Sequence, residues 1–315
     1  MKQAIKYFSI AAAVIFVSCL IISIFYSRSL YQALIVNNES NWPPFITAII
    51  NRLPHREAPA PKIIFKSENT IKILEGWTSL DINRYFDRSG QWPKNEFLAV
   101  AGWPRVDYRH TSKPALTDFS DQFSFLADKP KYYGLEGYLF PDTYRIYASS
   151  TATEVVEKML TNFDEKLTPQ LRADIKAQGK TIYDIVTMAS IIEKEAPINY
   201  QTGDNHDARI ISGIFWKRLK VGQALQSDAT LSYILDDTQP QHSNQDLQID
   251  SPYNTYKYRG LPPGPICNPG ILAIEAAIYP IATDYYYFLT PPSGNEVIYA
   301  RTNDEQNINK NKYLR

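Results

Sequence analysis

The feature that most constrains this chain is an uninterrupted apolar run near its N-terminus. Residues 7–26, YFSIAAAVIFVSCLIISIFY, contain no Asp, Glu, Lys or Arg. At about 1.5 Å of rise per residue, a helix of this length reaches about 30 Å, the thickness of the hydrocarbon core of a bilayer. The run therefore predicts a transmembrane helix. No second run of this kind follows, so we expect a single pass.

The charges beside the run predict its orientation. Lys2 and Lys6 precede it, whereas only Arg28 follows closely. The positive-inside bias places residues 1–6 in the cytoplasm and everything after residue 26 outside. The apolar segment is longer than a typical signal-peptide core, and no small-x-small cleavage site follows it. We therefore expect a retained anchor and not a cleaved signal peptide.

Composition narrows the classes of function. Lys plus Arg and Asp plus Glu balance at 33 each, so the chain lacks the basic excess of nucleic-acid-binding proteins. The two cysteines, Cys19 and Cys267, supply neither a disulfide framework nor a metal-binding spacing. The 22 Tyr and 5 Trp suit core packing and also suit a sugar-binding groove. We expect no nucleic acid, no metal and no cofactor.

The outer part of the chain divides into three regions, and its predicted fold class is α+β. Residues 27–66 are rich in Pro and polar residues, which is typical of a juxtamembrane stalk. Residues 67–130 form a small α+β module and a connector. The module starts with a strand that alternates Ile71 and Ile73, and continues with a short helix capped by Ser79 or Asp81. It acts either as a spacer or as a glycan-binding module.

Residues 131–315 form the larger mixed α+β domain. We expect helices over about 151–177, 181–196 and 206–222, a helix that ends at Pro280, and a closing β-hairpin. Two irregular stretches stand out. YGLEGYLFPDTYRI, residues 133–146, holds Glu136 and Asp142, and a Pro- and Gly-rich loop covers 250–270. Irregular stretches of this length inside a domain are usually functional.

The helix predicted at 181–196 ends in two glutamates, Glu193 and Glu195. Helical spacing places Glu193 on the apolar face and turns Glu195 about 160° away, toward water. Burial disfavours a charged carboxyl and raises its pKa, so Glu193 is a candidate general acid. The alternative is a structural Glu193 that pairs with Arg209 or Arg218. The apolar face consists of Ile182, Ile185, Val186, Ala189 and Ile192.

Five motifs, in order, carry a family resemblance. They are LEGYLFPDTY (135–144), ASIIEKEA (189–196), LQSDAT (225–230), DSPYNTY (250–256) and GLPPGPICNPG (260–270). Together with the N-terminal run, they resemble the endolytic murein transglycosylases, the MltG or YceG-like family. The resemblance covers roughly residues 70–315.

The resemblance implies an enzyme of the bacterial cytoplasmic (inner) membrane, with a LysM-like module and a periplasmic or extracellular catalytic domain. It would cut the MurNAc-β-1,4-GlcNAc bond of nascent peptidoglycan without water, leave 1,6-anhydroMurNAc ends, and so terminate strand elongation. Its partners would be glycan strands, the membrane and cell-wall synthases. The alternatives are a hydrolytic muramidase and a non-catalytic glycan-binding scaffold for the synthases.

The resemblance maps the catalytic acid onto Glu193, which the helical count selects as well. One acid suffices, because the attacking group is the C6 hydroxyl of the substrate itself, unlike the paired carboxylates of ordinary glycosidases. Glu195 would support its neighbours. The remaining expected substrate-binding or supporting residues are Gln226, Ser227, Asp228, Tyr253, Asn254, Thr255, Tyr256 and Glu136.

Overall fold

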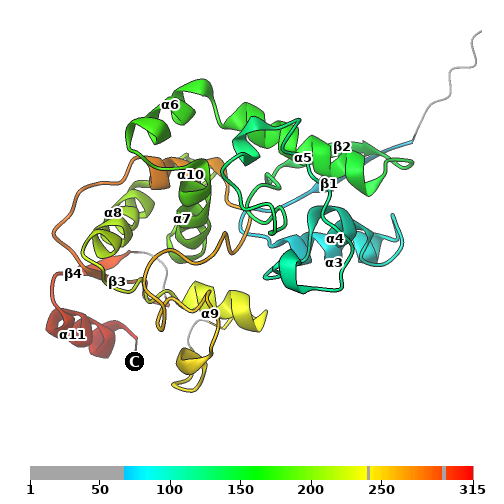
Figure 1. The fold of residues 1–315 in the computed structure, drawn as a ribbon. Helices are drawn as coiled ribbons and strands as arrows, with labels where there is room; N and C mark the ends of the chain where they lie inside the picture. The colour runs from blue at the N-terminus through cyan, green and yellow to red at the C-terminus, as the bar shows by residue number, and fades with distance from the viewer. Residues whose placement is uncertain (1–66, 240–241, 293–295, 315) are drawn as a thin grey trace, which may run out of the picture. The chain divides into compact units, whose positions relative to one another are not determined.

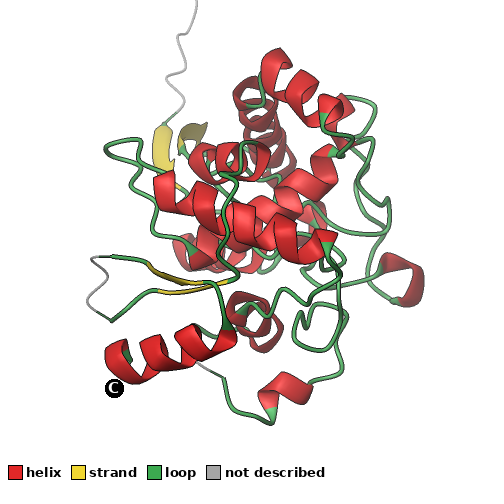
Figure 2. Ribbon diagram, turned by 90° about the vertical axis from the view of Figure 1, so that its left-hand side faces the viewer, coloured by secondary structure: helices red, strands yellow, loops and turns green. Residues whose placement is uncertain are grey.

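A computed structural model describes residues 67–239, 242–292 and 296–314 of the chain. The predicted transmembrane helix and stalk lie outside these residues. Among the helices that the structure does describe, none combines the length and the apolar character needed to cross a bilayer. The described residues form one compact unit. The described part is mainly helical, with two small two-stranded sheets, which makes it α+β (Figure 2).

The described chain begins with a β-α-α-β arrangement. Strand β1 (Glu68–Lys72) pairs antiparallel with β2 (Thr143–Tyr147), and Ile71 lies opposite Tyr144. Helices α3 (Ser79–Ser89) and α4 (Glu96–Ala101) lie between the two strands in sequence. The predicted strand and helix are both present. The sheet joins the expected module to a strand from beyond residue 130.

Capping chemistry sets the start of α3. Thr78 is the N-cap: its hydroxyl accepts from the amide of Asp81, and the Asp81 carboxylate accepts from the amide of Thr78. This reciprocal pair satisfies two amides that a helix start leaves unpaired. The expectation that Ser79 or Asp81 is the N-cap is therefore wrong, because the N-cap is Thr78. Asp81 instead supplies the second half of the capping box.

The helix predicted over 151–177 is two helices. Helix α5 (Ala152–Lys166) ends before Leu167, and α6 (Pro169–Ala177) begins after its N-cap Thr168. Pro169 occupies the first turn of α6, where a missing amide hydrogen costs nothing. The prediction of one helix fails at this proline.

Helix α7 (Ile182–Glu195) is central to the unit. It packs against α10 (Ile271–Ile278), α8 (His206–Lys220), α6 and α9 (Asp228–Leu235), as Figure 1 shows for α7, α8 and α10. Every residue from Ile185 to Ile192 is buried, including Thr187 and Ser190. Helix α7 therefore has no solvent-facing side over this stretch, and only its C-terminal turn reaches a cleft.

The C-terminal elements complete the unit. Strands β3 (Tyr287–Leu289) and β4 (Ile298–Ala300) form the predicted antiparallel hairpin, and α11 (Asn303–Tyr313) packs against both. Helices α8 and α10 match the expected positions. Helix α9, which begins at Asp228 of the LQSD motif, is not predicted from the sequence.

Candidate active site

A cleft of about 1390 Å³ crosses the unit at the C-terminal end of α7. One wall comes from α3 and the loop at Pro104, and the opposite wall comes from α9 and the chain that follows it. Strand β3 and α11 line a further side. Clefts of this kind are the usual location of ligand sites. The charged residues in its lining are Asp81, Arg84, Arg105, Lys194, Glu195, Arg218, Asp228, Asp236, Asp237 and Lys310.

Glu195 lines this cleft, so the prediction that it points toward open water is wrong. Its Oε1 accepts a hydrogen bond from the Ser227 hydroxyl and a longer one of 3.3 Å from the amide of Ala229. Burial raises the pKa of Glu195, the Ser227 and Ala229 donors oppose the rise, and Asp228 adds to it. Glu195 is therefore a desolvated carboxyl at the wall of the cleft.

The LQSD and YNTY motifs form one wall together. The amide of Gln226 donates to the Thr255 carbonyl at 3.2 Å, and the amide of Ser227 donates to the Thr255 hydroxyl at 3.0 Å. The Tyr256 hydroxyl donates to Asp228 at 2.8 Å. Residues about thirty positions apart are thus fixed side by side, next to Glu195.

Three of the predicted binding residues reach the cleft from this wall: Gln226, Asp228 and Tyr256. Gln226 is exposed and has a φ of 53°, in the left-handed region that a residue with a side chain seldom adopts. Burial raises the pKa of Tyr256, which stays protonated and donates to Asp228. Ser227 is buried and acts on the cleft through Glu195.

Tyr253, Asn254 and Thr255 do not line the cleft. The Asn254 side-chain amide donates to the carbonyls of Leu247 and Ile249, which fixes the loop. Tyr253 is buried and packs 5.2 Å from the ring of Tyr233. These three residues hold the shape of the wall.

Glu193 lies on another side of α7, and it is not among the residues that line the cleft. Its Oε2 accepts from the Tyr200 hydroxyl at 2.5 Å and from the amide of Gly270 at 3.0 Å, at the start of α10. Burial raises the pKa of Glu193 to about 7. A side chain at Gly270 would collide with Tyr200, because its Cβ would lie 2.4 Å from that hydroxyl oxygen. Glu193 is half-buried, and its setting is the junction of α7 and α10.

Arg218 is a cleft residue that sequence reasoning names only as a possible partner of Glu193. It is 5% exposed, and its guanidinium donates to the carbonyls of Leu225 and Tyr286. It forms none of the described ion pairs, and burial lowers its pKa. Its charge lowers the pKa of Glu195. The sequence does not identify Arg218 as a cleft residue, because arginines are common near the C-terminus of a helix.

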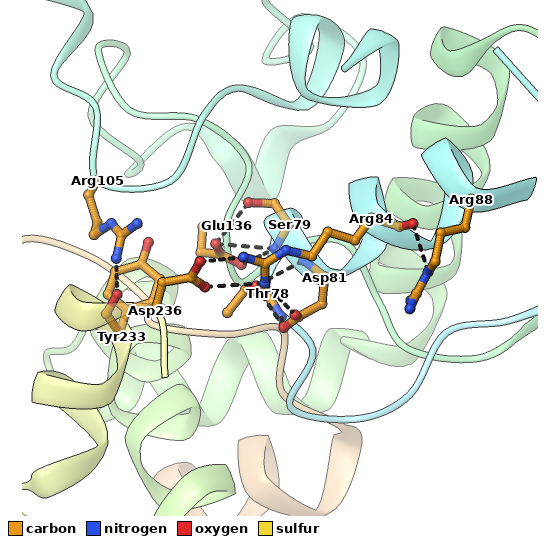
Figure 3. A network of polar contacts seen from close by, with 9 residues as sticks. All are labelled: Thr78, Ser79, Asp81, Arg84, Arg88, Arg105, Glu136, Tyr233 and Asp236. Carbon is orange, nitrogen blue, oxygen red and sulfur yellow. Dashed lines mark hydrogen bonds and ion pairs between the residues drawn. The ribbon is translucent and has the colours of Figure 1, made fainter. Parts of the chain in front are cut away.

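Glu136 is buried beside the start of α3 and away from the cleft lining (Figure 3). It accepts from the amide and hydroxyl of Ser79, at 2.9 and 2.8 Å, and from the side-chain amide of Asn268 at 3.1 Å. Burial raises the pKa of Glu136 to about 7. Asp142, in the same stretch, accepts from the Asn162 side chain at 2.9 Å. Both carboxylates fix the irregular stretch 133–146, which we call the aromatic loop.

Asn268 links three segments, and sequence reasoning does not single it out. Its Oδ1 accepts from the amides of Gly137 and Leu139 at 2.9 and 3.0 Å, and its Nδ2 donates to the carbonyl of Trp77 at 2.9 Å. The side chain is fully buried. It therefore fixes the 260–270 loop to the aromatic loop and to the turn before α3.

Two arginines from the N-terminal side of the cleft reach across to α9 (Figure 3). Arg84 on α3 pairs with Asp236, and Arg105 donates to the backbone carbonyls of Tyr233 and Ile234, the latter at 2.7 Å. Arg84 also pairs with Asp81 at 3.2 Å. The two walls of the cleft are thus connected by cationic side chains.

Among the described residues, no group of His, Cys, Asp and Glu side chains could hold a metal ion. The cleft lining offers carboxyl, guanidinium, ammonium, imidazole, hydroxyl and phenol groups. A carboxyl whose pKa is raised by burial can donate a proton, and a nearby carboxylate can stabilise positive charge. The arrangement suits acid catalysis on an electrically neutral bond such as a glycosidic bond.

Comparison with known proteins agrees with the motifs. A family model described as the YceG-like family matches residues 46–312. An endolytic murein transglycosylase of Bacillus subtilis is 39% identical over 180 residues, 57% of this chain and 48% of that protein. One of Streptococcus pneumoniae is 35% identical over 182 residues, 56% of this chain and 32% of that protein.

A solved structure extends the comparison to the fold. A YceG-like protein from Listeria monocytogenes is 31% identical, covers 76% of this chain and 75% of its own, and superposes with a TM-score of 0.64. The chain spans about half the length, or less, of the curated relatives it matches.

Proposed function

The chain belongs to the YceG-like family, and we propose that it is a peptidoglycan lytic endotransglycosylase. It cuts the β-1,4 bond between MurNAc and GlcNAc within a glycan strand and leaves 1,6-anhydroMurNAc ends. Relatives at 35–39% identity are named endolytic murein transglycosylases, which supports the reaction class. The cleft of about 1390 Å³, with a desolvated carboxyl in its wall, supports a sugar substrate of several units.

The observation that carries the proposal is the position of Glu195, which we take as the catalytic acid. It lines the cleft together with Asp228 and Tyr256, whereas Glu193 does not. Burial raises its pKa, which favours the protonated form that a general acid needs. The Ser227 hydroxyl fixes its orientation.

The proposed reaction needs one acid and no water. The Glu195 carboxyl gives its proton to the glycosidic oxygen, the bond from that oxygen to the anomeric carbon breaks, and the GlcNAc part leaves with a free hydroxyl. The C6 oxygen of MurNAc then attacks the anomeric carbon, and the Glu195 carboxylate takes the C6 proton. The acid is thereby restored. Positive charge that develops on the sugar is stabilised by the carboxylate of Asp228.

Glu193 is the alternative acid, and it is the one that the family resemblance selects. Its pKa, raised to about 7, suits proton donation. Its carboxylate is bonded to Tyr200 and Gly270 at the junction of α7 and α10. In our proposal Glu193 instead holds the end of α7, so that Glu195 faces the cleft.

The cellular setting is proposed on the residues outside the described part. A helix over residues 7–26 would anchor the protein in the bacterial cytoplasmic (inner) membrane, with the catalytic domain outside. From that position the enzyme would act on nascent strands beside the cell-wall synthases and terminate their elongation. The LysM-like assignment of the N-terminal module, and its binding of glycan, belong to the same proposal.

Product analysis tests the reaction class. The purified chain is incubated with un-crosslinked glycan strands, and the products are identified by mass spectrometry. Anhydro ends are expected. Reducing ends would instead indicate a muramidase, in which another carboxylate of the cleft, Asp228, would activate water. Binding of strands with no cleavage at all would favour the scaffold.

A further inference from the structure

A second hollow, of about 570 Å³, lies in the irregular chain between α4 and β2. From 102 to 142 this chain contains regular structure only in the 3-10 turns Tyr108–His110 and Ser124–Leu126. The volume suits a small ligand. Long irregular segments inside a compact unit are usually functional.

The hollow combines an apolar floor with a basic rim, and we call it the basic hollow. Ala101, Phe119 and Leu126, on the floor, are buried. Four basic side chains line it, Arg109, Lys113, Lys129 and Lys131, against one carboxylate, Asp118. Such a lining favours an anion that also carries small apolar groups.

Two of the four cations have no carboxylate partner within the described ion pairs. Arg109 pairs with Asp107 at 2.6 Å, and Lys131 approaches Asp118 at 3.7 Å. The Lys113 ammonium lies 4.0 Å from the ring centre of Trp103. The Lys129 ammonium donates to the carbonyls of Pro130 and Tyr133, and burial lowers its pKa to about 8. An anion in the hollow would supply the missing negative charge.

The basic hollow lies close to the cleft, because a small cavity shares lining residues with both. A small cavity of about 20 Å³ is lined by Tyr133 and Gly134, which also line the basic hollow. The same cavity is lined by Pro104 and Arg105, which also line the cleft. The lining that this cavity shares with each hollow therefore makes the basic hollow a neighbour of the cleft.

We propose that the basic hollow binds the acidic peptide that branches from the muramic acid of a peptidoglycan strand while the glycan lies in the cleft. This inference rests on the proposed function. Such a peptide carries free carboxylates for the two unpaired ammonium groups and small apolar side chains for the floor. The charge and lining of the hollow, and its closeness to the cleft, carry the argument. Peptide binding makes the enzyme prefer strands with intact peptides over bare glycan.

The test compares two forms of one substrate with the full chain. Un-crosslinked strands are used intact and after an amidase has removed their peptides, and kcat/KM is measured for each. We expect the wild type to prefer intact strands about tenfold, the effect of one charge-assisted hydrogen bond. Lys113→Gln/Lys129→Gln is expected to lose this preference while cleaving bare strands as the wild type does. The matched control is Lys72→Gln/Lys94→Gln, which removes two exposed lysines outside the hollow.

The single variant Lys113→Gln guards against misfolding, because Lys129 also bonds backbone carbonyls. It is expected to reduce the preference about threefold or more. Equal wild-type rates on both substrates, or an unchanged preference in the double variant, would overturn the inference and leave the proposed function standing. If neither substrate is cut, the proposed function fails, and calorimetric titration with a soluble muramyl peptide decides this inference. Binding by the wild type but not by the double variant supports it, and absence of binding by the wild type overturns it.

Discussion

Replacing Ser227 with alanine should move the pH profile of cleavage upward. The Ser227 hydroxyl is the principal donor to the Glu195 carboxylate, since the other donor, the Ala229 amide, lies at 3.3 Å. A hydrogen bond to a carboxylate favours the charged form, so its loss raises the pKa of Glu195 further. A proton donor works only while protonated, so Ser227→Ala should remain active to higher pH than the wild type.

The size of the shift follows from the strength of the lost bond. Hydrogen bonds to charged groups contribute about 1.5–3 kcal/mol, and one pKa unit corresponds to about 1.36 kcal/mol. The basic limb of kcat/KM should therefore rise by about one to two pH units. A shift near one pH unit is expected if a water molecule in the cleft replaces the Ser227 hydroxyl as the donor to Glu195. The assay is kcat/KM for isolated glycan strands between pH 5 and 9, because this ratio reports the free enzyme.

Ser232→Ala is the matched control. Ser232 lines the same cleft, but its hydroxyl lies 3.0 Å from His242 Nε2 and has no described bond to Glu195. The basic limb of kcat/KM for Ser232→Ala should stay within a few tenths of a pH unit of the wild-type position. A Ser227→Ala profile that is unshifted, or shifted to lower pH, would refute the assignment of Glu195 as the acid.

Two further predictions concern stability. The pKa of Glu136 is about 7 in the folded chain, against 4.5 for a free side chain, so the folded state binds this proton more tightly. The resulting contribution to the unfolding free energy is complete below about pH 4.5. It is lost as the pH rises through 7. Glu136→Gln should therefore reduce the fall in unfolding free energy between pH 4.5 and 7 by up to about 3 kcal/mol in urea titrations, and an unchanged slope would contradict this. Asn268→Ala should lower the unfolding free energy by about 3–5 kcal/mol, because it leaves the buried amides of Gly137 and Leu139 without their acceptor. A loss under 1 kcal/mol, measured by denaturant unfolding, would show that water replaces the side chain.

Elements with a strong local signal could be predicted from the sequence. The alternation at Ile71 and Ile73 marks β1, and the amphipathic pattern of 206–220 with Gly222 marks α8. The turn residues around 292–295 mark the β3–β4 hairpin. The prediction from local sequence was wrong where one residue carries two signals. Pro169 suits the first turn of α6 but ends the helix before it.

Helical spacing alone does not determine which side of α7 faces the cleft. The helical count assumes one apolar side and one solvated side, but α7 is surrounded by α6, α8, α9 and α10. Met188 and Ile191 lie off the presumed inner face and are apolar as well, which is the signature of a helix buried all round. On such a helix both glutamates are desolvated, and only the tertiary arrangement places one of them in the cleft.

The motifs predicted the neighbourhood of the site better than its contacts. LQSD and YNTY do meet, through Gln226, Ser227 and Thr255. Which of their side chains reach the cleft depends on loop geometry, for instance on the left-handed backbone of Gln226. Arg218 and Asn268 contribute through backbone carbonyls and amides far away in sequence, and no residue pattern encodes those partners.

The central claim is that Glu195, and not Glu193, gives the proton. The most direct measurement compares the initial rates of glycan-strand cleavage by Glu195→Gln and Glu193→Gln, each confirmed to be folded by circular dichroism. We predict that Glu195→Gln loses about 10²–10⁴-fold in rate, as expected for the removal of a general acid, while Glu193→Gln stays within about tenfold of the wild type. Near wild-type cleavage by Glu195→Gln together with an inactive, folded Glu193→Gln would contradict the account.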